Sequence, residues 1–87
     1  MVSRADVMRQ LRKELPQLEF TVESGREHFQ DRFTVYKPLH IPRCYLAVSA
    51  LYDVKITIQA SGNNPKRHFK KIASAVRYLD SFFYGEG

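Results

Sequence analysis

The sequence predicts a single two-layer α+β domain, in which two helices cover one face of an antiparallel sheet of three to four strands. Three observations lead to this fold class. A helical apolar pattern opens the chain, a second one closes it, and the segments between them alternate apolar and polar residues with the period of strands. The 87 residues suffice for one domain with one small core, so residues 1–87 are treated as a single unit. The expected order is helix, strand, strand, an ambiguous segment, strand, helix.

The first helix is predicted from Ser3 to the residue before Pro16. Ser3 can cap its start, and Asp6 follows at the spacing of a capping box. Pro16 cannot continue a helix and therefore ends it. One face of this helix carries the apolar side chains Val7, Met8, Leu11 and Leu15.

Two strands are predicted next, and they form a hairpin with a longish loop. Residues 18–22 alternate apolar and polar side chains, and Gly25 ends the run. Residues 32–36 follow, with Phe33 and Val35 expected to face the core. Residues 37–42 hold two prolines and are predicted to be a loop.

Residues 44–52 are apolar on both faces, and two interpretations remain open. The segment can be a buried strand, which we favour. Alternatively, Pro42 can start a helix that turns four apolar side chains inward. Residues 54–58 then form the clearest strand of the chain, because valine and isoleucine alternate there with lysine and threonine.

The last helix is predicted to begin at Asn64, which can cap it, with Pro65 at the first helical position. A narrow apolar stripe supports this helix: Phe69, Ile72, Val76, Leu79 and Phe83. Its outward half would carry five bases and no acid: Lys66, Arg67, Lys70, Lys71 and Arg77. Their summed charge equals the net charge of the whole chain, +5, and such a concentration of charge favours a polyanionic partner.

Composition argues against several other classes of protein. Cys44 is the only cysteine, so no internal disulfide can form, and a buried, unreactive thiol is expected. The three histidines are scattered, and neither a metal-ligand spacing nor a catalytic motif is present. We therefore expect no enzyme activity, no cofactor and no metal. The N-terminus lacks the apolar core of a signal peptide, and no run is long enough to span a membrane, which predicts a soluble, cytoplasmic protein.

Two segments resemble a double-stranded RNA-binding domain, a family that runs helix, three strands, helix. PQLEFTVESGREHFQDRFTV places Pro16, Gly25, His28 and Phe33 in the order that the family shows around its first hairpin. KRHFKKIASA is similar to the lysine-rich opening of the family's last helix and its alanine-rich face. Arg26 stands where the family's turn has a proline.

The resemblance implies three sets of RNA contacts, which read shape and 2′-hydroxyls more than sequence. The opening of the last helix would contact phosphates through Lys66, Arg67, Lys70 and Lys71. The hairpin turn would contribute Arg26 and His28, and the first helix would contribute Arg9, Gln10 and Lys13. The expected function is a non-catalytic nucleic-acid-binding module for structured or double-stranded RNA, with RNA favoured over DNA.

A small protein-interaction module is the alternative function, such as a phage- or plasmid-type inhibitor or an accessory subunit. The short chain starting at Met1 favours it. Several aromatic residues fall outside the predicted core and could bind a partner protein or a second copy of the chain. The candidate interface residues are Tyr52, Phe82 and Tyr84.

Overall fold

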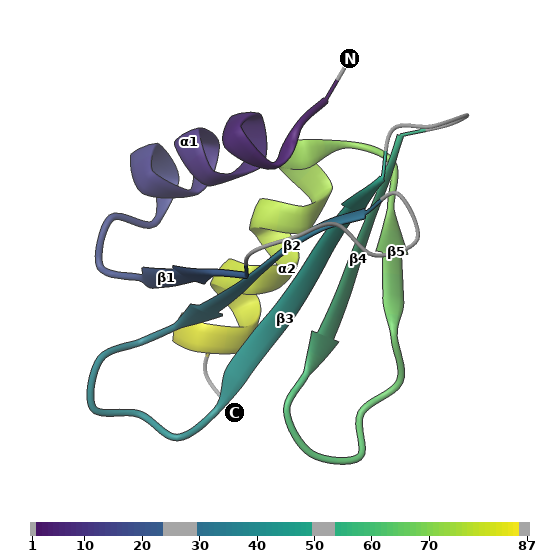
Figure 1. The fold of residues 1–87 in the computed structure, drawn as a ribbon. Coiled ribbons are helices and arrows are strands. Elements are labelled where there is room, and N and C mark those ends of the chain that lie inside the picture. Colours follow the sequence, from purple (N-terminus) through teal and green to yellow (C-terminus); the bar gives the residue numbers. More distant parts are fainter. Residues whose placement is uncertain (1, 24–29, 50–53, 86–87) are drawn as a thin grey trace.

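The computed structural model describes residues 2–23, 30–49 and 54–85, which form two helices and one five-stranded antiparallel sheet (Figure 1). The elements in chain order are α1 (Arg4–Glu14), β1 (Glu19–Val22), β2 (Gln30–Tyr36), β3 (Arg43–Ser49), β4 (Lys55–Ala60), β5 (Arg67–Phe69) and α2 (Ile72–Tyr84). The predicted α+β class, with a helix first and a helix last, is confirmed. The sheet has five strands, where three to four were expected.

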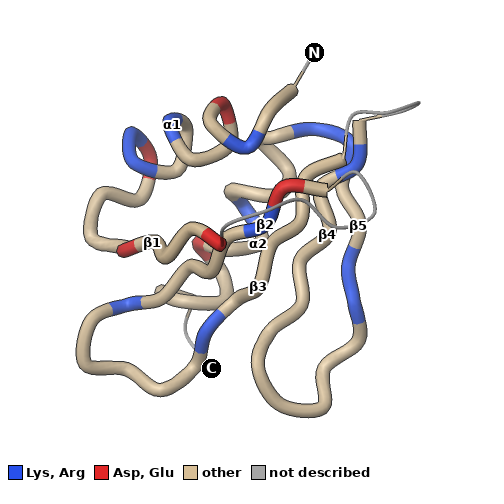
Figure 2. Tube along the Cα trace, in the orientation of Figure 1, with Lys and Arg blue, Asp and Glu red and all other residues tan. Residues whose placement is uncertain are grey.

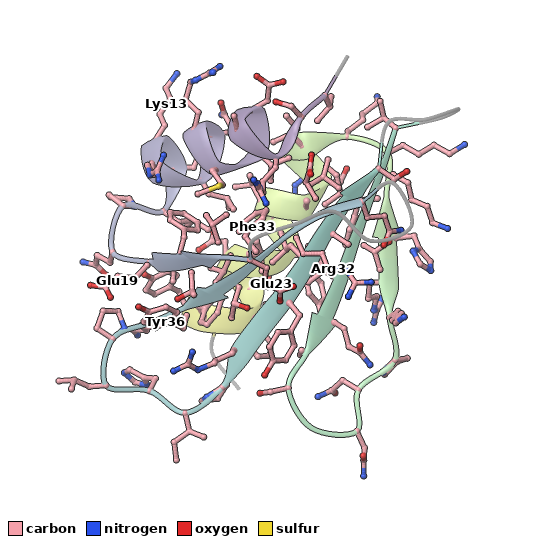
Figure 3. The ribbon with its side chains drawn as sticks, viewed as in Figure 1. Lys13, Glu19, Glu23, Arg32, Phe33 and Tyr36 are labelled. Atoms are coloured by element: carbon pink, nitrogen blue, oxygen red, sulfur yellow. The ribbon has the colours of Figure 1, made fainter. Side chains whose placement is uncertain are left out.

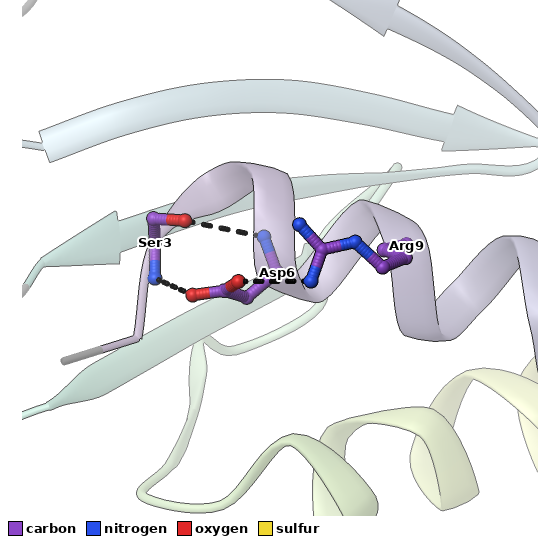
Figure 4. A network of polar contacts seen from close by, with 3 residues as sticks. All are labelled: Ser3, Asp6 and Arg9. Atoms are coloured by element: carbon purple, nitrogen blue, oxygen red, sulfur yellow. Dashed lines mark hydrogen bonds and ion pairs between the residues drawn. The ribbon is translucent and has the colours of Figure 1, made fainter.

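Helix α1 begins with the capping box that the sequence predicts (Figure 4). The backbone N–H of Asp6 donates to Ser3 Oγ at 3.2 Å, and the backbone N–H of Ser3 donates to Asp6 Oδ2 at 2.9 Å. Arg9 adds an ion pair to the same carboxylate, with 3.3 Å between Nη1 and Oδ1. These contacts satisfy N–H groups that the first turn of a helix leaves without partners.

The sheet is a meander, because the strand order β1-β2-β3-β4-β5 is also the chain order. Its longest hairpin pairs β2 with β3, with Phe33 opposite Leu46 and Val35 opposite Cys44. Along β3, buried Cys44, Leu46 and Val48 alternate with more exposed residues. The strand interpretation is therefore confirmed for the described part of the ambiguous segment, and residues 50–53 lie outside the described residues.

Both helices pack on the same face of the sheet and contact each other (Figure 1). Helix α1 lies against β2, and α2 lies against β4 and β5. The register places the apolar strand residues on this one face, where they join the helices in a single core. Fully buried members of the core include Val7, Leu11, Phe33, Val35, Cys44, Ile56, Ile58, Ala75 and Leu79. The opposite face of the sheet is not covered by either helix.

The predicted start of the last helix is wrong, because α2 begins at Ile72 and not beside Asn64. Arg67–Phe69 instead forms β5, which pairs with β4 and satisfies backbone groups that β4 would otherwise expose. Asn64 belongs to the preceding turn, where its side-chain amide donates to Ser61 O at 2.8 Å. Its own carbonyl accepts a hydrogen bond from Gln59 Nε2 at 3.2 Å. Asn64 therefore stabilises a β-turn connection rather than a helix start.

Two smaller features complete the fold. Val22, one of the apolar residues of the predicted strand 18–22, is half exposed because β1 is an edge strand. None of the helices in the described segments has the length and apolar content needed to cross a membrane.

Candidate nucleic-acid interface

The basic residues expected on one helix face lie on β5, on the residues directly before and after β5, and on α2. Figure 2 shows positive residues on β5 and on the segment that leads from β5 to α2. Of the five predicted bases, only Arg77 belongs to α2. Lys66 to Lys71 hold four bases in six residues, and all four are exposed. We call residues 66–71 the basic segment.

Strand geometry divides the first half of the basic segment between the two faces of the sheet. Arg67 and Phe69 face the helices: the Arg67 guanidinium lies 5.7 Å from the ring centroid of Tyr78, and the Phe69 ring lies 5.5 Å from the same ring. His68 faces the other way, where its Nδ1 is 3.0 Å from Thr57 Oγ1. Lys66 lies on the same side as His68, on the face of the sheet that neither helix covers. We call this the open face, and Lys66 lines a groove there that is described below.

Lys70 and Lys71 lie at the start of α2. Lys71 is the N-cap residue with an extended backbone, and no side chain caps the helix there. The first turn of α2 contains no acid. The positive end of the helix dipole therefore coincides with two exposed lysine side chains. This placement differs from the sequence prediction, in which both lysines belonged to the second turn of a longer helix.

Arg77 is separated from the basic segment and lies beside α1. It lines a groove of about 340 Å³ between the two helices, together with Gln10, Glu14 and Asp80. Gln10 Nε2 donates to Glu14 Oε1 at 3.2 Å. Two acids and one base line this groove, so its charge does not favour a polyanion.

The remaining candidate residues are spread over other parts of the chain. Arg9 is on α1 and pairs with Asp6. Lys13, also on α1, points away from the sheet (Figure 3). Arg26 and His28 lie outside the described residues. The structure therefore does not bring the α1 candidates and the basic segment into one described cluster.

A second positively charged feature, which the sequence does not predict, is a groove on the open face of the sheet. It has a volume of about 430 Å³ and crosses from the end of β1 to β5. Figure 3 shows two of its residues, Glu23 and Arg32, in front of the sheet. Among the residues that the structure describes, the lining is Glu23, Gln30, Arg32, Tyr45, Leu46, Ala47, Lys55, Thr57, Gln59, Lys66 and His68. The alternating polar positions of the strands were the signal for this groove, but only the register shows which of them become neighbours.

Aromatic and basic side chains also alternate on the open face beside this groove. Tyr36 pairs with Arg43 across β2 and β3, and the Arg43 guanidinium lies 4.7 Å from the Tyr36 ring centroid. Tyr45, two residues further along β3, is 46% exposed. Guanidinium groups and phenol rings are both suited to nucleobases, because each presents a planar face.

The only thiol of the chain offers no nucleophile. Cys44 is fully buried in the centre of the sheet, and burial raises the pKa of its thiol to about 12 because the thiolate would lose its hydration. Among the described residues, no group of histidine, cysteine, aspartate or glutamate side chains is arranged to hold a metal ion.

The predicted protein interface is less exposed than expected. Phe82 is half-buried and packs against Phe83, with 4.8 Å between ring centroids. Tyr84 is also half-buried, and Lys37 Nζ lies 4.7 Å from its ring centroid. Both aromatic residues pack against the core. Tyr52 lies outside the described residues.

Comparisons with protein-family models, curated proteins and solved structures found no match to this chain. The resemblance to a double-stranded RNA-binding domain therefore remains a prediction. The chain keeps the helix–strands–helix order of that family, with five strands in place of three.

Proposed function

We propose that this chain is a non-catalytic nucleic-acid-binding module for structured or double-stranded RNA. The observation that carries the proposal is the charge of the basic segment. From Val54 to Leu79 the chain contains no acid, and four of its bases lie between Lys66 and Lys71. These four side chains are exposed, so they can reach phosphates without a rearrangement of the core.

The position of Lys70 and Lys71 favours an anionic group such as a phosphate. Their ammonium groups adjoin the start of α2, where the helix dipole attracts negative charge and no acid competes. Lys66 and Arg67 continue the positive charge onto the edge strand of the sheet. A ligand with several charges matches these four bases better than a single anion does. The preference for RNA over DNA rests on the family resemblance alone.

A gel-shift experiment tests this function with duplex RNA, duplex DNA and single-stranded RNA at two salt concentrations. We expect micromolar binding to RNA that weakens steeply at the higher salt, because each neutralised phosphate releases counterions. Lys70→Glu with Lys71→Glu should abolish binding, whereas Lys70→Arg with Lys71→Arg should preserve it. Absence of binding to every nucleic acid, or full binding by the charge-reversed variant, would refute the proposal.

A protein-interaction function is the second candidate, and one observation favours it. In the loop between β2 and β3, Leu39 is fully exposed and Ile41 is 91% exposed. Leu39 also has a positive φ of 65°, a conformation that costs a residue with a side chain roughly 1–2 kcal/mol. Two exposed aliphatic side chains on one loop are suited to an apolar pocket of a partner, and we take a second copy of the chain as that partner.

Sedimentation equilibrium distinguishes this second function from the first. A homodimer through the loop should dissociate when Leu39 and Ile41 are both changed to serine, and its dissociation should be insensitive to salt. A wild-type chain that stays monomeric at all concentrations would contradict it.

A further inference from the structure

The groove on the open face of the sheet is positioned to bind a ligand of its own. Both helices cover the opposite face, so neither closes the groove. Residues from β2, β3 and β4 line it, as do Glu23 after β1 and His68 on β5. Ala47 lies between Arg32 and Thr57 in the register, so a methyl group stands between larger side chains and leaves room there. The volume of about 430 Å³ falls within the range of small-ligand sites.

The charge of the groove favours an anionic occupant. Among the described lining residues, Arg32, Lys55 and Lys66 carry positive charge, and Glu23 carries negative charge. Lys66 is the first residue of the basic segment, so the groove and the proposed phosphate contacts adjoin each other along β5. A polyanion bound by the basic segment can therefore continue into the groove without crossing a negative region of its lining.

Tyr45 favours an unpaired base as the group that fills the groove. Tyr45 is 46% exposed on the central strand β3, and it is one of the exposed large apolar side chains among the described residues. Gln59 pairs directly with Tyr45 across β3 and β4, and Thr57 and Gln30 lie further along the groove, so amide and hydroxyl groups that can donate and accept hydrogen bonds line it. A base inside a duplex cannot stack on this ring, because both of its faces are already covered by neighbouring base pairs.

We propose that the groove binds a single-stranded segment of RNA, with one base stacked on Tyr45 and adjacent phosphates near Arg32, Lys55 and Lys66. This inference rests on the proposed nucleic-acid function and extends it to a second site. The basic segment holds phosphates of a structured region, and the open face of the sheet holds an unpaired segment that continues from it.

Fluorescence of a Tyr45→Trp variant tests the stacking directly, because the chain contains no other tryptophan. Oligouridine of about ten nucleotides, a length that OB-fold-sized sites accommodate, should quench this fluorophore. A blunt RNA duplex should not quench it, even where gel shifts show that the duplex binds. Quenching by the duplex and not by oligouridine would overturn the proposal.

Affinity measurements on two matched pairs of variants complete the test. Tyr45→Ala should weaken oligouridine binding by about fivefold or more, whereas Tyr45→Phe should retain it because the ring remains. Gln30→Glu adds a negative charge to the groove and should weaken binding. Gln17→Glu adds the same charge at an exposed position outside the groove and should change binding less. Circular dichroism establishes that each variant is folded.

The outcomes separate this inference from the function on which it rests. If no nucleic acid binds the wild-type chain, both proposals fail. If RNA binds and depends on Lys70 and Lys71, but Tyr45→Ala and Gln30→Glu bind oligouridine like the wild type, the groove proposal alone is overturned.

Discussion

At the scale of single residues, Cys44 is a thiol enclosed in the core of the domain. Its thiol is buried, and its pKa is raised to about 12, so it stays protonated at neutral pH. Because the thiolate is the reactive form, we expect a disulfide reagent to modify Cys44 only after the chain unfolds. Absorbance of the released thiol, followed in native buffer and in guanidinium chloride, measures this. Rapid modification in native buffer would show that β3 opens far more readily than its burial indicates.

The lowered pKa of Asp6, at the start of α1, predicts how the stability of the fold depends on pH. The backbone hydrogen bond from Ser3 lowers the pKa of the Asp6 carboxyl, and the Ser3 hydroxyl and Arg9 contribute in the same direction. A carboxyl with a lower pKa in the folded chain stabilises that chain above the pKa of the unfolded chain, and the stabilisation is lost as pH falls through the folded pKa. The free energy of unfolding of the wild type should therefore exceed that of Asp6→Asn at neutral pH, and the difference should shrink in acid. A difference that grows as pH falls would contradict this assignment.

At the scale of elements, β5 gives the basic residues a structural role beside the proposed RNA contacts. An edge strand exposes backbone groups that can pair with another chain, and charged side chains discourage such pairing. We therefore expect Arg67→Val with His68→Val to increase association, because the strand becomes apolar and β-branched. Sedimentation velocity at several concentrations measures the average mass. Lys13→Val on α1, which removes the same charge outside the sheet, is the control and should behave like the wild type.

The elements differ in how far the sequence alone determines them. Helix α1 could be predicted because Ser3, Asp6 and Pro16 act within a few residues of one another. The start of α2 could not, because Asn64 and Pro65 suit both a helix cap and a turn. The pairing of Arg67 with Ile58 across β4 and β5 decides between them, and no local pattern encodes it. The groove around Tyr45 is harder still to predict, because its lining comes together only when all the strand registers are known.

At the scale of the whole molecule, one core joins both helices and the sheet, so the chain should unfold as a unit. Leu79 is fully buried where α2 meets this core, and Leu79→Ala should lower the free energy of unfolding by about 2–5 kcal/mol. Ser81→Ala, at an exposed position of the same helix, should change it by less than about 0.5 kcal/mol. Urea titrations followed by near- and far-ultraviolet circular dichroism measure both. Separate transitions for the two signals would contradict unfolding of the chain as a unit.

The meander also determines the order in which the chain can fold during synthesis. Every strand pairs with the strand made just before it, so the sheet can grow strand by strand without waiting for a distant partner. Helix α2 is synthesised after all five strands, yet it covers the β4 and β5 side of the apolar face. Until those residues leave the ribosome, that side of a nascent sheet remains uncovered. The growing chain is therefore exposed to aggregation, and in need of a chaperone, until α2 appears.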